Sequence, residues 1–193
     1  AAAPASDAAR DLAQGWQRQE AADRAALPDA ALAGVDGADP ARLAAGLGLP
    51  LDLVLRRLGL IEPHSGLMIC DGAGGVIFRR PARGMGPARP GDPCAMLPIF
   101  EALGQPGTPV TRLIETETGL RLQAIALATR HPAAGLGGPV LSRAVMLLRP
   151  APEDADAAAV AVGPTCRICP RPACPARRVA SILHPPVPGA RLL

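Results

Sequence analysis

A chain of 193 residues suits one ordinary domain, or a small domain with a helical appendage. Hydrophobic residues make up 49% of it but aromatic residues only 2%, so the core has to be built mainly from Leu, Val, Ile and Ala. The net charge is +3, and a value so close to zero does not demand a nucleic-acid partner. The sequence carries no signal-peptide pattern and no apolar run of about 18 residues, which predicts a cytoplasmic protein without a membrane segment.

Helical periodicity dominates residues 1–62, which we interpret as a helical segment. A first helix is expected within residues 1–33, where Leu12 and Trp16 lie one turn apart on the same face. Pro28 interrupts this pattern, and the Gly-rich stretch after it ends the helix.

A second helical unit begins at Asp39 and Pro40, a preferred pair for the N-cap and first helical position. Two short helices over residues 41–45 and 51–58 resemble the outline of a helix-turn-helix, so a small DNA-binding protein is an alternative. A recognition helix has to present polar side chains to base edges. Residues 51–58 are mostly apolar, which favours packing against a core.

The period changes within residues 63–150, which we interpret as a sensor-like α+β domain. Strands are bounded by Gly-rich turns, which supply the positive φ angles of hairpins. The expected elements are a hairpin of residues 67–70 and 76–79, a short helix at 94–103, a hairpin of 110–115 and 120–129, and a strand at 140–148. The sequence therefore predicts an antiparallel sheet of hairpins with a central helix on one side.

A polar linker is expected at residues 151–162, and a cysteine-rich tail packed on the sensor domain follows at 163–193. Three of the five cysteines crowd into this tail with the spacing C-x2-C-x4-C: Cys166, Cys169 and Cys174. Clustering of this kind suits a metal better than loop-closing disulfides. Four nearby arginines, at positions 167, 171, 177 and 178, lower the cost of gathering thiolate charge.

Three thiolates are one ligand short of a closed site. Cys94, at the expected start of the central helix, is the natural fourth, and His184 is another option. Cys70 sits in an apolar strand pattern, where a free Cys behaves as a small hydrophobe. Four thiolates suit an iron–sulfur cluster and a structural zinc ion equally well, so both remain open.

The tail is similar to a known signature. Residues 166–177 match C-R-x-C-x-R-x-x-C-x-x-R, which closes the short-chain fatty acyl transcriptional regulators. Residues 66–81 look like the first hairpin of that family, and 90–103 look like its Cys-containing helix start. The resemblance covers residues 64–186.

This resemblance implies a regulator of short-chain acyl metabolism that binds acyl-CoA, with a [4Fe-4S] cluster in some members. Carried over by position, the cluster ligands would be Cys94, Cys166, Cys169 and Cys174. The resemblance implies that CoA phosphates would meet arginines at the first hairpin and the loop after it, namely Arg79, Arg80 and Arg89, whose forks match phosphate. The N-terminal XRE-type domain of the family is not recognisable here, so DNA would be contacted only through another domain.

Catalysis is not expected. The three histidines, His64, His131 and His184, do not form an H-E-x-x-H pair, and the chain has no G-x-S-x-G elbow, P-loop or G-x-G-x-x-G fingerprint. We therefore predict a redox or metabolite sensor domain of a bacterial transcription regulator. A structural-zinc binding module is the alternative, and the sequence leaves a homodimer open.

Overall fold

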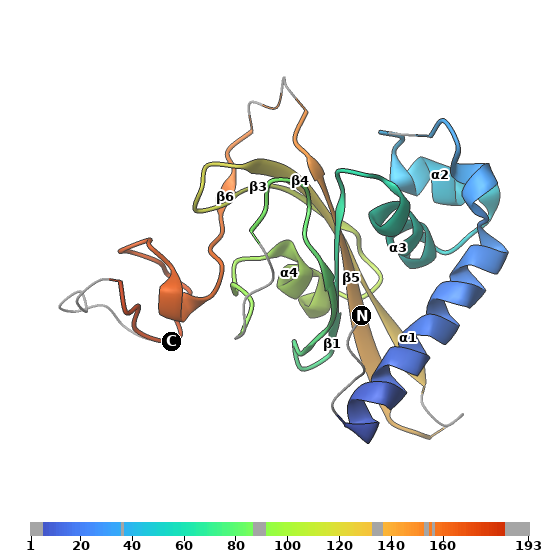
Figure 1. The fold of residues 1–193 in the computed structure, drawn as a ribbon, viewed down its shortest axis with the longest axis horizontal. Helices are drawn as coiled ribbons and strands as arrows, with labels where there is room; N and C mark the ends of the chain where they lie inside the picture. The colour runs from blue at the N-terminus through green and yellow to red at the C-terminus, as the bar shows by residue number, and fades with distance from the viewer. Residues whose placement is uncertain are drawn as a thin grey trace.

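A computed structural model of the chain describes residues 6–35, 37–86, 92–132, 137–152, 155 and 157–183. One mixed sheet forms its centre, and helices cover both faces of that sheet (Figure 1). The α+β class predicted from the sequence is confirmed. The helices are α1 (Asp7–Ala26), η1 (Asp29–Leu32), α2 (Pro40–Leu47), α3 (Leu51–Ile61), α4 (Pro98–Gly104) and η2 (Cys166–Ile168). The strands are β1 (Gly66–Asp71), β2 (Val76–Arg80), β3 (Val110–Glu115), β4 (Arg121–Pro132), β5 (Val140–Pro150) and β6 (Val160–Ala161). None of the described helices is both long enough and apolar enough to cross a membrane.

The six strands lie in the order β2-β1-β5-β4-β3-β6. Each neighbouring pair is antiparallel except β3 and β6, which run parallel. Both predicted hairpins are present. Strands β4 and β5 are longer than expected, because they pair with each other along almost their whole length. The first pair is Leu122 with Pro150, and the last is Pro132 with Val140. The parallel edge strand β6 lies inside the stretch that the sequence predicted to be a linker.

Capping residues mark the ends of the N-terminal helices. Ser6 accepts a hydrogen bond from the backbone N–H of Ala9 at the start of α1, and the helix ends just before Pro28. Asp39 caps α2 and accepts from the N–H of Ala41 at 2.8 Å. Gly48 ends α2 in the left-handed region at φ 63°, a conformation that glycine adopts without steric cost.

Helix α3 is buried against the sheet. Val54, Leu55 and Leu58 are at most 1% exposed and pack in the core between the helices and one sheet face. The arginines of α3 are buried as well: Arg56 binds Asp23 at 2.6 Å and Asp52 at 2.7 Å. Burial acts to lower the pKa of Arg56, but these two carboxylates raise it above its usual value.

Arg57, the neighbouring arginine on α3, donates to the carbonyl of Leu27 and to Asp29. The guanidinium groups of both Arg56 and Arg57 are therefore occupied inside the molecule. They are not available to a DNA phosphate, so the fold counts against reading this helix pair as a DNA-binding element.

The central helix α4 begins later than predicted. It starts at Pro98, and Leu97 before it is extended with ψ 135°, because the ring of a proline disfavours helical backbone in the preceding residue. Cys94 therefore precedes the helix by one turn of irregular chain rather than standing at its start.

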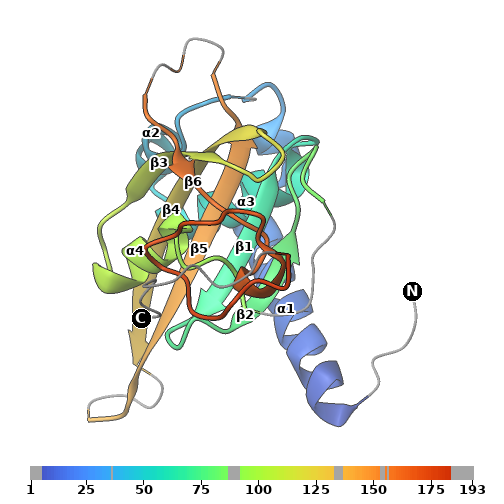
Figure 2. The ribbon, with the colours of Figure 1, turned by 90° about the vertical axis from the view of Figure 1, so that its left-hand side faces the viewer.

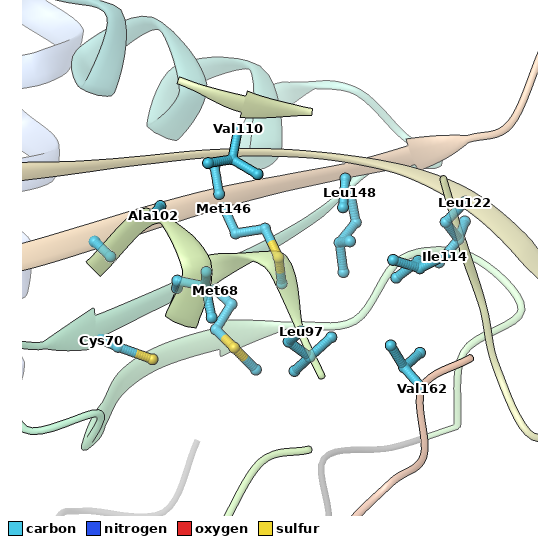
Figure 3. Close-up of a cluster of buried hydrophobic side chains, with 14 of the residues drawn as sticks. Met68, Cys70, Leu97, Ala102, Val110, Ile114, Leu122, Met146, Leu148 and Val162 are labelled. Carbon is cyan, nitrogen blue, oxygen red and sulfur yellow. The ribbon is translucent and has the colours of Figure 1, made fainter. Parts of the chain in front are cut away.

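Two hydrophobic cores flank the sheet. One lies between the sheet and α1–α3, and the other lies under α4 and the C-terminal segment (Figure 3). The predicted central helix α4 lies on one side of the sheet, and the N-terminal helices, whose position the sequence did not predict, cover the other side. Both faces of β1, β4 and β5 are therefore buried in their central stretches.

Candidate functional site

The C-terminal tail folds back onto the sheet face that carries α4 (Figure 2). Val162 follows β6, is 2% exposed, and its N–H donates to the carbonyl of Glu115 at 2.9 Å. Arg171 then holds the tail to the end of β3, donating to the carbonyls of Glu115 at 3.1 Å and Thr116 at 3.2 Å. The tail is thus tied to backbone carbonyls at the end of β3, before the cysteine cluster by Val162 and within it by Arg171.

Two further arginines shape the cysteine loop. Arg177 donates to the carbonyl of Cys166 at 3.1 Å and to that of Arg171. Arg178 donates to the carbonyl of Pro93 at 2.8 Å, beside Cys94. These guanidinium groups close the loop and bring it next to the segment before α4.

This role of the arginines was missed by sequence reasoning, which treated them only as charges near the thiolates. The signal was present: prolines at 170, 172 and 175 carry no N–H, so the loop has more carbonyl acceptors than backbone donors. Arg offers five donors in a fixed fork and supplies what such a loop lacks.

Four cysteines from two distant segments line one small pocket of about 10 Å³. Cys94 comes from the segment before α4, and Cys166, Cys169 and Cys174 come from the tail. The structure therefore brings together all four residues that the sequence singled out as ligands. Within the described part of the chain, however, no three His, Cys, Asp or Glu side chains are already arranged as a metal shell.

The surroundings of Cys94 place it close to the tail thiols. Burial raises the pKa of the Cys94 thiol, and the nearby Cys174 and Cys166 raise it further. Hydrogen bonds from the backbone of Gly163 and Met96 act in the opposite direction and stabilise the thiolate. Thiolates gathered this closely repel each other, and a bound metal cation would remove that repulsion. The arrangement therefore suits a metal centre.

The donor set fits a thiolate-bound metal. Four sulfur ligands around one position suit zinc or an iron–sulfur cluster. Cys70 is separate from this set, because it is fully buried in the core and burial raises its pKa to about 11. His184, the other option for a fourth ligand, lies outside the described residues.

A second pocket of about 140 Å³ adjoins the cysteine pocket. Its floor is apolar: Met68, Met146 and Leu148 project from the sheet towards Leu97 and Val162 (Figure 3). Its rim is polar and includes Arg79 and residues 116–118. The segment 162–164 lines this pocket, and Gly163 within it also lines the cysteine pocket, so the two share a wall.

The three predicted phosphate-binding arginines have different surroundings. Arg79 is paired with Met68 across the β1–β2 ladder, so its side chain lies on the pocket face of the sheet. Burial lowers its pKa, while Glu117 acts to raise it. Arg80 is paired with Leu67 on the opposite face, and its guanidinium donates to the carbonyl of Gly59 at 2.6 Å, at the end of α3.

Arg89, the third arginine, lies outside the described residues. Of the two that can be placed, only Arg79 has both a pocket-facing position and no hydrogen bond or close ion pair to another described residue. It is the side chain best placed to meet an anionic group on a ligand.

A family model described as "Short-chain fatty acyl coenzyme A regulator, C-terminal" matches residues 65–187. The chain matches no curated protein. Among solved structures, the fold is similar to that of a Mycobacterium tuberculosis transcriptional regulator, with a TM-score of 0.72 and 22% identity over 97% of this chain. The chain spans 62% of the length of that solved chain, and at this identity the likeness shows a common fold.

Proposed function

Since the chain belongs to the short-chain fatty acyl coenzyme A regulator family, we propose that it is the sensory part of a bacterial transcription regulator and that it works in the cytoplasm. It holds a cysteine-ligated centre at Cys94, Cys166, Cys169 and Cys174, and a short-chain acyl-CoA in the adjoining pocket. The observation that carries this proposal is the meeting of Cys94 with the three tail cysteines around one pocket. All five cysteines are free thiols, which suits a reducing compartment.

A [4Fe-4S] cluster is the centre that we propose for these thiols, and when bound it would supply one-electron redox chemistry. The part of this chain is to hold four sulfur donors that come from separate segments. Binding would fasten the tail to the sheet face, and loss of the centre would release it, because metal binding and local folding are linked.

A structural zinc ion is the second candidate for the same thiols. One observation favours it: the free space among these cysteines is small, about 10 Å³, close to what one water molecule needs. In this case the ion would only fasten the tail, and the apolar pocket would carry the sensing.

The acyl-CoA part of the proposal is supported by the shape of the second pocket. The pocket has a volume of about 140 Å³ and an apolar floor, which suits a short acyl chain. Transfer of such a chain from water contributes roughly 0.8 kcal/mol per buried CH₂. Arg79 at the rim would bind a phosphate or the thioester carbonyl. No catalytic step is assigned to the chain, because a sensor only has to bind and release its ligand.

The centre is tested by anaerobic purification, an absorption spectrum and analysis of iron, sulfide and zinc. A brown protein with about four iron and four sulfide per chain supports the cluster. A colourless protein with about one zinc per chain supports the second candidate. A chain that takes up neither iron nor zinc, even after anaerobic reconstitution, refutes the cysteine-ligated centre.

The pocket is tested by calorimetric titration with butyryl-CoA. Arg79→Met should weaken binding about 10-fold or more, because a charge-assisted hydrogen bond contributes about 1.5–3 kcal/mol. Arg83→Met is the matched control, since Arg83 is an exposed arginine of the next loop whose guanidinium lies beside His64. Equal affinities for Arg79→Met and the unaltered chain would remove Arg79 from the site.

A further inference from the structure

We propose that Gly163 is a positioning residue for the cysteine centre: the missing side chain at this position leaves the space that the Cys169 sulfur occupies. This inference rests on the thiolate centre proposed above and names a residue outside its ligand set. One residue, Val162, separates Gly163 from the end of β6. Gly163 lies in the wall between the two pockets.

The geometry leaves no room for a methyl group. A Cβ at position 163 would lie 2.6 Å from Cys169 Sγ and 3.4 Å from Cys169 Cβ. Distances below 3.0 Å are essentially never found for real Cβ atoms, so one of the two residues would have to move. Gly163 does not have a positive φ, so space rather than backbone conformation requires glycine here.

Neither residue can move freely. On the glycine side, Val162 is buried and hydrogen-bonded to Glu115, and the Gly163 backbone is hydrogen-bonded to the Cys94 thiol. On the cysteine side, the carbonyl of Cys169 accepts a hydrogen bond from Ser181 Oγ at 2.9 Å.

The remaining freedom is rotation about the Cα–Cβ bond of Cys169. That rotation would carry the sulfur away from the pocket that it shares with the other three cysteines. A shift of the glycine segment instead would disturb the hydrogen bond to Cys94. Either response of an alanine variant therefore misplaces one of the four thiols.

The test is a Co²⁺ titration of the metal-free, reduced 193-residue chain, read by the thiolate-to-cobalt charge-transfer absorption. Gly163→Ala should bind Co²⁺ about 10- to 100-fold more weakly than the unaltered chain, the usual loss when a residue that orients a metal ligand is changed. Gly104→Ala is the matched control, because a Cβ at Gly104 meets no atom within 4 Å. Its affinity should stay within about twofold of the unaltered chain.

A double-mutant cycle separates a positioning role from a general structural one. In a Cys169→Ala background the sulfur is gone, so adding Gly163→Ala should change Co²⁺ affinity by less than about twofold. The same 10- to 100-fold loss in both backgrounds would overturn the inference, because the effect would not pass through Cys169.

Folding is checked by circular dichroism of each variant. If Gly163→Ala alone unfolds while the double variant folds like Cys169→Ala, the clash with the thiol is supported; if the double variant also unfolds, the inference is refuted. An unaltered chain that shows no thiolate–cobalt band and takes up neither iron nor zinc would refute the proposed centre itself. A normal band with unchanged affinity in Gly163→Ala would refute only the role of Gly163.

Discussion

The buried ion pair between Glu62 and Arg149 should dominate the attachment of the N-terminal helices to the sheet. Glu62 ends α3, and its carboxylate accepts hydrogen bonds from Arg149 Nε at 2.9 Å, from Arg149 Nη2 and from Ser65 Oγ. Arg149 lies on β5 and also donates to the carbonyl of Ala38 at 2.7 Å, before α2. Both charged residues are 7% exposed. Replacing Glu62 with Gln keeps the shape of the side chain and removes its charge.

The expected cost follows from this burial. Glu62→Gln leaves the Arg149 guanidinium buried beside a neutral amide, and removing one partner of a buried pair typically costs about 3–5 kcal/mol. The net stability of a domain is only about 5–15 kcal/mol, so the variant should lose a large part of its free energy of unfolding. Replacing both partners by apolar residues, as in Glu62→Leu with Arg149→Met, should recover most of this loss, because no unpaired charge is then buried.

Urea unfolding measures the loss. Circular dichroism follows the whole fold, and the fluorescence of Trp16 reports the attachment of α1, because its ring stacks on Phe78 of β2 with centroids 4.2 Å apart. The control is Glu20→Gln on α1, whose partner Arg24 is 58% exposed and whose loss should cost less than about 1 kcal/mol. If Glu62→Gln costs no more than this control, the pair is not what fastens α3 to the sheet.

Further predictions concern two buried positions, Cys70 and Gly66. Because burial raises the pKa of Cys70 from 9.0 to about 11, its thiolate fraction at pH 8 falls from about one in ten to about one in a thousand. Iodoacetamide should therefore label Cys70 in the native chain at least about 100-fold more slowly than in urea, as followed by mass spectrometry, and rapid native labelling would contradict its burial. Since the protonated form is favoured by folding, this contribution to stability is lost as the pH rises from 9.0 to about 11. Gly66→Ala should cost about 1–3 kcal/mol, measured as a lower Tm, because its Cβ would lie 2.5 Å from the backbone nitrogen of Ala82. An unchanged Tm would show that the start of β1 can move away from the backbone of Ala82 without cost.

The local signals in the sequence were sufficient for most elements. Asp39 and Pro40 predicted the start of α2, and the Gly-rich turn after Asp71 predicted the first hairpin, where Asp71 accepts from the N–H groups of Ala73 and Gly75. The cysteine spacing also predicted that three thiols would lie together. Each of these features depends on residues close in the chain, where turn and cap chemistry decides the outcome.

The features that were missed depend on distant contacts. Pairing of β6 with β3 and the position of the tail are set by Arg171 and Val162, which bond carbonyls at the end of β3. The different surroundings of Arg79 and Arg80 follow from strand register, which places neighbouring residues on opposite faces. A sequence pattern shows two adjacent arginines there and does not indicate which of them faces a pocket.

The wall at residues 162–164 has a consequence for how the two pockets would communicate. Gly163 lines both, so any occupant of one that shifts this segment changes the free energy of occupying the other. Linkage makes such an effect mutual: the factor by which an acyl ligand alters retention of the centre equals the factor by which the centre alters retention of the ligand. With the two occupants proposed above, the supply of acyl ligand and the state of the cysteine centre would be combined into a single signal.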